Sequence, residues 1–182
     1  MSQLAYSSVP AWARTTVTPD VDGPDWSGRS YILVGVGPAA NNVLRRWMDQ
    51  LPHGKHCHAL CCGRAAEACD ALRAALADAR VGVRVLVAAP VGEALALRAT
   101  ATTAGLADDE IHVETTGSGV VEVFCAHCRR VTSTSGTVDD VVDCVGCGRN
   151  LLVYHHVSRR SGRYLGFMVD AEAPTGRAEV SS

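Results

Sequence analysis

The sequence of 182 residues has no excess of basic side chains and few aromatic ones. Its 17 Lys and Arg are outnumbered by 19 Asp and Glu, so the formal net charge is -2 at pH 7. Proteins that bind nucleic acid by neutralising phosphates need a clustered excess of cations, and this balance disfavours that class. Two Phe, three Trp and four Tyr are the only aromatic residues, and no platform for stacking bases is visible.

Segments that would direct the chain into or across a membrane are also missing from the sequence. The first ten residues carry neither a basic region nor the apolar run of a signal peptide. No later stretch approaches the roughly 20 apolar residues that cross a bilayer. We therefore expect a cytoplasmic protein with no membrane partner. In that reducing compartment, the eight cysteines should be thiols or metal ligands rather than disulfides.

The first two thirds of the chain predict an irregular arm followed by an α/β domain. Residues 1–29 are rich in Ser, Thr, Pro, Asp and Gly without a sustained period, and we expect Trp12 and Trp26 to pack on the chain's own body. From residue 30 to 118, short β-rich runs alternate with helical runs, which predicts a small three-layer domain with a parallel sheet. The expected strands are 31–34, 58–62, 83–88 and 111–114, and the expected helices are 39–51, 65–79 and 92–105.

Within this domain, two groups of residues are expected to be buried. The first helix carries its apolar residues on one face: Val43, Leu44, Trp47, Met48 and Leu51. The second strand is short and apolar, and we expect it to be buried, with the residues before it forming a polar loop. Four cysteines in and near it lack the spacing of iron-sulfur ligands, and they are interpreted as small core residues: Cys57, Cys61, Cys62 and Cys69.

The last third of the chain has a different pattern, with short strands and paired cysteines. Residues 119–172 predict a β-rich zinc-ribbon domain after a linker rich in Thr, Ser and Gly. The overall fold class is therefore α/β, with a parallel-sheet domain followed by a β-rich one. Residues 173–182 are small and polar and are predicted to be disordered.

Two C-x-x-C motifs, Cys125-Ala-His-Cys128 and Cys144-Val-Gly-Cys147, are separated by fifteen residues. This spacing is typical of ribbon-type zinc sites, in which each turn aims two sulfurs at one point. We expect a strand hairpin between the turns to bring the pairs face to face, and Gly148 suits the tight turn. Four thiolates leave no open position, so a structural Zn²⁺ is predicted. Iron, as in a rubredoxin-like electron carrier, suits the same ligand set.

A glycine turn, Gly35-Val-Gly37-Pro-Ala-Ala40, follows the first strand and opens the first helix. This is the position of a dinucleotide-binding turn, where backbone N–H groups and the helix N-terminus face phosphate. No acidic residue follows about twenty positions later, where a ribose partner is usual. Gly35 and Gly37 are thus candidate residues of a vestigial cofactor-binding turn, and a purely structural turn is equally open.

The N-terminal half resembles the pyridine-nucleotide lobe of ferredoxin-reductase-type flavoprotein reductases. The segments that carry the resemblance are 33–38, 58–64, 85–90 and 105–114. That family has Cys-Gly-Pro where this chain has Ala88-Ala-Pro90, and Gly-Gly-x-Gly-x-Thr-Pro where it has Val34-Gly-Val-Gly-Pro38. These departures fall on the residues that hold nicotinamide and pyrophosphate. The resemblance therefore implies the fold of the lobe and includes no flavin lobe.

The C-terminal half resembles the small zinc-binding subunit, DmmA, of bacterial dimethylamine monooxygenase. The resemblance is carried by segments 124–130, 144–160 and 164–172, which include Tyr-His-His and Gly-Phe-Met-Val-Asp-Ala-Glu. It implies a multisubunit NAD(P)H-dependent enzyme that oxidatively demethylates dimethylamine to methylamine and formaldehyde. Haem would belong to a larger subunit, and FMN and a [2Fe-2S] cluster to a reductase subunit. This chain would be an accessory subunit acting in assembly or electron-transfer coupling.

Between two expected strands lies a segment dense in side chains that recognise anions or aromatic surfaces. We predict that it forms a hairpin tip that docks on a partner subunit, although a solvated turn is also open. Its candidate residues are Tyr154, His155, His156, Arg159, Arg160, Arg163 and Tyr164. No nucleophile, base and oxyanion set is recognisable, so a non-catalytic subunit is expected. A rubredoxin-like iron carrier and a pyridine-nucleotide-binding reductase component are the alternatives.

Overall fold

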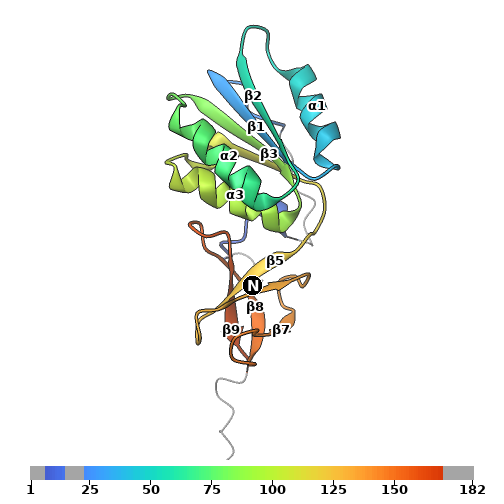
Figure 1. Cartoon of the computed structure of the whole chain (residues 1–182), viewed down its shortest axis with the longest axis vertical. Coiled ribbons are helices and arrows are strands. Elements are labelled where there is room, and N and C mark those ends of the chain that lie inside the picture. Colours follow the sequence, from blue (N-terminus) through green and yellow to red (C-terminus); the bar gives the residue numbers. More distant parts are fainter. Residues whose placement is uncertain (1–6, 15–22, 170–182) are drawn as a thin grey trace, which may run out of the picture.

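The computed structural model describes residues 7–14 and 23–169, which form two sheets stacked end to end along the long axis of the molecule (Figure 1). The predicted disordered tail, residues 173–182, lies outside the described residues. No helix in the described part of the chain is long and apolar enough to cross a bilayer.

The first sheet, which we call sheet A, is a four-stranded parallel sheet with strand order β2-β1-β3-β4. Its elements are β1 (Ser30–Val36), α1 (Ala40–Gln50), β2 (His56–Cys62), α2 (Ala65–Ala77), β3 (Val83–Ala89), α3 (Val91–Thr103), the short helix η3 (Asp108–Glu110) and β4 (Ile111–Thr115). Each expected strand and helix is present within three residues of its predicted bounds. Gly105 follows α3 in the left-handed conformation (φ +103°), as its predicted role at the helix end requires.

Alternation along the two central strands builds a three-layer structure, because successive side chains point to opposite faces. On one face, Tyr31 and Leu33 pack with Leu44 and Trp47 of α1. On the other face lie the valines and isoleucine of β1 and β3, covered by α2 and α3 (Figure 1). Both faces of β1 and β3 are buried, which explains their nearly continuous apolar sequence. The predicted fold class is confirmed.

The prediction that the second strand is buried was wrong. β2 is an edge strand that begins at His56, within the predicted polar loop, and most of its residues are exposed. Cys57 and Cys61 are exposed, so their interpretation as core residues was also wrong, whereas Cys62 and Cys69 are half-buried against the α2 side of the core. Strand order depends on long-range topology, and an apolar sequence cannot distinguish an edge strand from a central one.

On α1, the buried apolar face is narrower than predicted. Met48 is 46% exposed, while Val43, Leu44 and Trp47 are buried. A single helix covers this side of sheet A, so a residue at the margin of its apolar stripe has no neighbouring helix to pack on.

The second sheet, which we call sheet B, is five-stranded and mostly antiparallel, with strand order β6-β5-β9-β8-β7. Its strands are β5 (Val121–Cys125), β6 (Val131–Thr134), β7 (Val141–Asp143), β8 (Asn150–Val157) and β9 (Tyr164–Met168). β5 and β9 pair in parallel in the middle of the sheet. The C-terminal part is therefore β-rich, as predicted, while the exact domain boundary after residue 118 stays a prediction.

Helix α3 and the N-terminal arm join the two sheets. α3 packs Leu97 on sheet A and Leu95 in the core of sheet B. The arm places Val9 in the same core and hydrogen bonds to β8, where the Ser7 hydroxyl donates to the carbonyl of His155 (2.8 Å). Trp12 contacts both cores, and the ring of Trp26 lies 5.3 Å from that of Tyr31, tilted by 57°, so both tryptophans pack on the chain itself as predicted.

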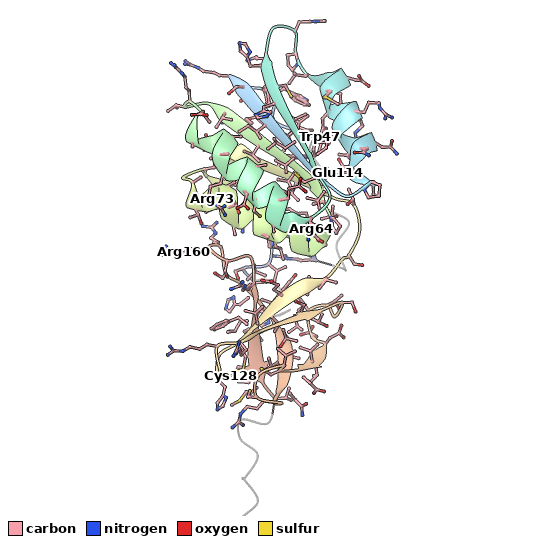
Figure 2. The ribbon with its side chains drawn as sticks, viewed as in Figure 1. Trp47, Arg64, Arg73, Glu114, Cys128 and Arg160 are labelled. Carbon is pink, nitrogen blue, oxygen red and sulfur yellow. The ribbon has the colours of Figure 1, made fainter. Side chains whose placement is uncertain are left out.

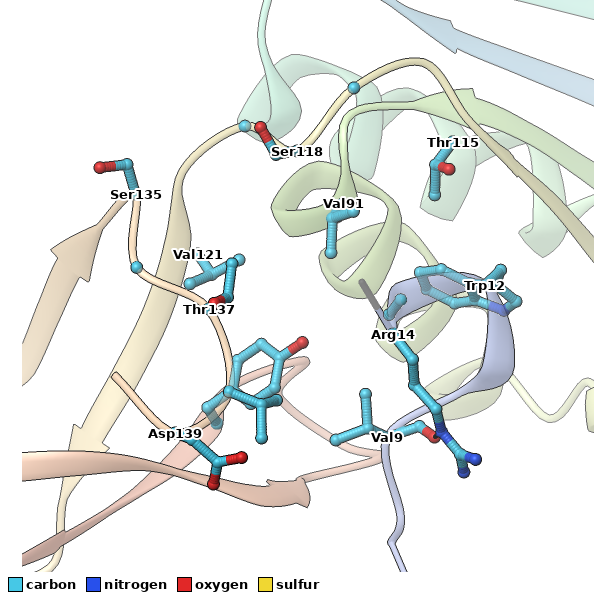
Figure 3. Close-up of a pocket in the computed structure, with 16 residues that line it drawn as sticks. Val9, Trp12, Arg14, Val91, Thr115, Ser118, Val121, Ser135, Thr137 and Asp139 are labelled. Atoms are coloured by element: carbon cyan, nitrogen blue, oxygen red, sulfur yellow. Dashed lines mark hydrogen bonds between the residues drawn. The ribbon is translucent and has the colours of Figure 1, made fainter. Parts of the chain in front are cut away.

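A pocket of about 300 Å³ lies at this junction (Figure 3). It is lined by the arm, the linker after β4 and the loop between β6 and β7, with Trp12 and Val91 on one side and Val121 and Thr137 on the other. The pocket therefore lies between the two halves, beside the N-terminal end of α3.

Candidate metal centre

Four cysteine sulfurs, from Cys125, Cys128, Cys144 and Cys147, lie within 4.8 Å of one another. The Sγ atoms of Cys125 and Cys147 are 3.9 Å apart, and those of Cys128 and Cys144 are 3.4 Å apart. A zinc ion with Zn–S bonds of about 2.3 Å holds its four sulfurs about 3.8 Å apart, since the ligands form a tetrahedron. The cysteines are therefore placed where four ligands of one metal ion belong, at the end of sheet B far from sheet A (Figure 2).

Each C-x-x-C turn is the tip of its own hairpin. Residues 125–130 connect β5 to β6, and residues 144–149 connect β7 to β8. The predicted hairpin between the two turns was wrong, because β6 and β7 lie at opposite edges of sheet B. The intervening chain, residues 131–143, instead crosses from one edge to the other. The two pairs meet because the sheet brings two separate hairpin tips together.

The two turns have the same backbone geometry, which we call the cysteine knuckle. In each, the first cysteine's N–H donates to the carbonyl five residues later, and its carbonyl accepts from the N–H four residues later. The residue at that fourth position is left-handed in both knuckles: Arg129 (φ +62°) and Gly148 (φ +68°). Gly148 thus has its predicted role, whereas Arg129 adopts a conformation that costs a side-chain-bearing residue about 1–2 kcal/mol.

Close packing holds the knuckles against each other. A Cβ atom on Gly146 would lie 2.9 Å from Cβ of Arg130 and 3.0 Å from the sulfur of Cys128, so only glycine fits there. The backbone N–H of Val145 donates to the hydroxyl of buried Thr132 on β6 (3.2 Å). Neither Gly146 nor Thr132 is among the residues predicted from the sequence. The glycine inside the second C-x-x-C motif was the available signal.

The environment of the four sulfurs favours a thiolate at Cys144 and disfavours a second thiolate beside it. Burial raises the pKa of Cys144, but N–H donors from Gly146 and Cys147 outweigh it and lower the pKa to about 6. At Cys128, an N–H from Arg130 lowers the pKa, but burial and the neighbouring sulfurs raise it to about 12. A second thiolate so close to the first is disfavoured by like charge. A divalent cation among the four sulfurs would offset that repulsion, since metal ligation requires thiolates.

The predicted docking segment is divided between a strand, a turn and the core. β8 extends through Tyr154, His155 and His156, so these residues are not part of the hairpin tip. His155 is only 9% exposed and Tyr164 only 3%, and burial raises the pKa of Tyr164 to about 12. As placed here, these two side chains are not available to a partner. Partner docking by the other residues of the segment stays a prediction.

The turn itself faces the chain's own α/β half. A Cβ atom on Gly162 would lie 2.6 Å from the carbonyl oxygen of Leu95 on α3, so the tip packs directly against that helix. Arg159 forms an ion pair with Asp108 of η3. Figure 2 shows Arg160 at the same junction between the two sheets. The tip thus contributes to the contact between the two halves of the chain.

At the glycine turn after β1, the structure supplies a packing reason for Gly35. A Cβ atom there would lie 2.5 Å from Leu44 and 3.1 Å from Cβ of Ala40, so the glycine lets α1 approach the sheet. Gly37 is left-handed (φ +77°), and its N–H donates to the carbonyl of Cys62 on β2 (3.0 Å). Both glycines therefore have structural roles, and nucleotide binding at this turn stays a prediction.

Comparison with known proteins bears on the same region. Residues 122–167 match the family model for the C-terminal domain of dimethylamine monooxygenase subunit DmmA-like proteins. The chain is also 39% identical over 103 residues to the delta subunit of a heme-dependent oxidative N-demethylase from Ectopseudomonas mendocina. That alignment covers 57% of this chain and 58% of the relative, so the chain spans little more than half of the relative's length. No solved structure matches the chain.

The matched residues, 122–167, begin in β5 and end in β9, and they contain all four clustered cysteines. The resemblance to DmmA-like subunits is confirmed by both comparisons. Sheet B with its cysteine knuckles is the part of the chain that is similar to the C-terminal domain of DmmA-like subunits.

Proposed function

We propose that this chain is a non-catalytic, zinc-binding subunit of a haem-dependent oxidative N-demethylase. The observation that carries the proposal is its 39% identity to the delta subunit of such an enzyme. The complex would use NAD(P)H and oxygen to convert dimethylamine to methylamine and formaldehyde. Haem would be bound by a larger subunit, and FMN and a [2Fe-2S] cluster by a reductase subunit.

The chemistry of the cysteine site supports a structural role for the metal. Four thiolates around one ion leave no position for a substrate or for water. Cys125 and Cys144 are buried, and Cys128 and Cys147 are half-buried, which limits access further. The ion would join two hairpin tips that also meet where Gly146 packs on Arg130 and where Val145 donates to Thr132. We therefore propose that zinc stabilises sheet B, which in turn presents a surface to the other subunits.

Reconstitution tests the proposal. The chain and the haem and reductase subunits from the same organism are co-expressed, and formaldehyde released from dimethylamine is measured with NADPH present. We expect turnover to fall at least about tenfold when the chain is omitted or carries Cys144→Ser and Cys147→Ser. Cys57→Ser, an exposed cysteine outside the cluster, is the matched control and should leave turnover unchanged. Full turnover without the chain would refute the proposed role.

Elemental analysis of this chain, purified without the haem and reductase subunits, distinguishes zinc from iron at the cysteine cluster. Zinc gives a colourless chain with one ion per molecule. Iron in a four-thiolate site gives a red chain whose visible absorption bleaches on reduction, as in a rubredoxin-like carrier. If iron is found, the proposed role of the metal becomes electron transfer and is no longer structural.

A further inference from the structure

The edges of the two sheets differ in how they are protected from pairing with another chain. Sheet A ends in β2 and β4, and sheet B ends in β6 and β7. β4, β6 and β7 have only five, four and three residues, and β4 and β7 carry an acidic residue, Glu114 and Asp143. Short strands and charged side chains both discourage edge-to-edge pairing. β2 has seven residues, none of them Lys, Arg, Asp, Glu or Pro, so it is the one edge of the described sheets without such protection.

The unpaired backbone groups of β2 belong to three alternate residues. Neighbouring residues of a strand direct their N–H and C=O groups to opposite sides. The carbonyl of Cys62 accepts from the N–H of Gly37, which follows β1, so every second residue back from Cys62 faces β1. Cys57, Ala59 and Cys61 therefore direct three N–H and three C=O groups away from the sheet, where no described residue bonds to them.

An antiparallel second copy of the same strand satisfies all of these groups at once. With a two-fold axis at Ala59, Cys57 of one copy lies opposite Cys61 of the other, and Ala59 lies opposite Ala59. Each such pair is of the hydrogen-bonded type, in which the two residues exchange both N–H···O=C bonds. A register shifted by two residues leaves an outward residue of the strand without a partner. A register shifted by one residue places outward residues opposite residues that face β1, so none of them can bond.

The side chains beside these backbone groups are small and are not covered by α1. The register of sheet A places Cys57 opposite Tyr31 and Ala59 opposite Leu33, so these residues share the face of the sheet that α1 covers. Leu33 is fully buried under α1, whereas Ala59 is exposed. The cover of α1 thus ends before β2, and it leaves room on this face for a second copy of the strand.

The margin of α1 next to β2 is apolar. Met48, which is 46% exposed, lies about 200° around the helix from Arg46, whose guanidinium pairs with Glu114 at the opposite edge of the sheet. Met48 therefore faces the β2 side, where a two-fold axis at Ala59 brings the margins of both copies toward each other. The other exposed charges of α1, Arg45 and Asp49, are of opposite sign.

Charged residues flank β2 without opposing one another across the axis. Lys55 precedes the strand and Arg64 follows it, and in the two-fold register they lie opposite Gly63 and Gly54 of the other copy. The carboxylate of Glu67 accepts from the N–H of Gly63 (3.3 Å), so it lies beside the position that Lys55 of the other copy would take. Self-pairing of β2 therefore places no cation directly opposite another cation.

We propose that β2 pairs with β2 of a second copy of this chain, antiparallel and about a two-fold axis at Ala59. The pairing joins the four-stranded sheets of the two copies into one continuous sheet. The proposal is independent of the N-demethylase function, because it rests on sheet A alone.

Charges introduced at position 59 test the axis, since a residue on the axis meets its own copy. The dimer dissociation constant of the purified full chain is measured by analytical ultracentrifugation. Ala59→Lys and Ala59→Glu should each raise that constant about tenfold or more, because like charges then face each other, and an equal mixture of the two should restore a heterodimer. Val81→Lys, at a residue 94% exposed before β3, is the matched control and should leave the constant unchanged.

Disulfide formation reads the register without a substitution on the axis. Under mild oxidation with diamide, the wild-type chain should form a covalent dimer through Cys57 and Cys61, because Cα atoms in a hydrogen-bonded pair lie about 5.5 Å apart. Cys57→Ser and Cys61→Ser keep the backbone bonds and should remain dimers. Neither variant alone should form the disulfide, whereas an equal mixture of the two should form it.

The remaining outcomes would overturn the pairing. A wild-type chain that is monomeric at every concentration measured would exclude a second copy as the partner of β2. A dimer that neither charge at position 59 weakens would place the contact on another surface, and efficient cross-linking of Cys57→Ser alone would contradict the register. Circular dichroism and metal content establish that the variants at position 59 are folded; if they are not, the mixture of cysteine variants decides.

Discussion

The two halves of the molecule reach stability by different means. The α/β half buries two layers of apolar side chains on either side of sheet A, with Trp47, Leu33, Leu72 and Leu86 almost fully inaccessible. Sheet B has a smaller core on one face only, part of which consists of the cysteines themselves. Domains of about 50 residues bury too little apolar surface to be robust without a metal or disulfides. An ion bound by the four cysteines, as we propose, would thus compensate for the smaller core of the C-terminal half.

Removal of the metal should produce the largest difference in stability between the two halves. A structural zinc ion contributes on the order of 10 kcal/mol to the folding of a small site, so chelation or Cys144→Ser should unfold sheet B. Hydrogen exchange, read strand by strand, should show protection lost in β5, β8 and β9 and kept in β1 and β3. Cys57→Ser is the matched control. Simultaneous loss in both sheets would show that the halves do not differ in this way.

Leu72→Ala should do the opposite, destabilising the α/β half while leaving sheet B intact. Leu72 on α2 is fully buried against sheet A, so its truncation should cost about 2–5 kcal/mol of unfolding free energy in the α/β half. Denaturant unfolding should show that transition move to lower denaturant while metal content per chain stays at the wild-type value. A parallel loss of metal would contradict the separation of the two cores.

Gly92→Ala tests how firmly the halves are joined. A Cβ atom at this position of α3 would lie 1.8 Å from the carbonyl oxygen of Val120, so helix and linker must move apart. We expect a loss of about 1–3 kcal/mol, the usual cost of overpacking, and a wider gap between the unfolding transitions of the two halves. Gly63→Ala is the control, since no atom lies within 4 Å of its added Cβ and its φ is not left-handed. Unchanged transitions in Gly92→Ala would mean that the junction is loose.

The smallest expected effects come from substituting the left-handed residue of each cysteine knuckle. Arg129→Gly should stabilise sheet B by up to about 1 kcal/mol, because glycine adopts the left-handed conformation without strain. Gly148→Ala should destabilise it by a similar amount, since the conformation is the same. Thermal unfolding of the metal-bound chain measures both. Changes of the same sign would contradict the matched geometry of the knuckles.

Local patterns in the sequence were sufficient to predict the helices and strands, but not which strands lie next to one another in the sheet. The helical spacing of Val43, Leu44 and Trp47 predicted α1, and the short apolar run of residues 83–88 predicted the strand β3. β2 ends in the apolar run Ala-Leu-Cys-Cys, yet it is an edge strand, because strand order follows from how the crossover helices pack on the two faces. Its exposed Cys57 and Cys61 could not have been identified from the chain alone.

At the metal site, too, the sequence predicted the residues but not the way the fold brings them together. The two C-x-x-C motifs were enough to predict which four residues meet. They did not reveal that each turn closes its own hairpin, or that Gly146 lets Arg130 and Cys128 approach. Two residues of the docking segment, His155 and Tyr164, are buried, because alternation continues through Tyr-His-His and turns every second side chain inward. The same alternation turns Phe124 and Phe167 outward, and it was visible in the sequence.

The hydrogen bonds from Ser7 and Ser8 to β8 affect the order in which the protein can be built on the ribosome. Ser8 accepts from the N–H of Val157 at 2.8 Å, across 149 residues of chain. A ribosome makes the serines near the start of synthesis and their partner strand β8 after the whole α/β half, so that half has emerged before this contact can form. Until then the arm and the inner face of α3 are exposed to solvent. Closure of the junction is therefore among the last steps of maturation, and it is the step at which a chaperone would find apolar surface to hold.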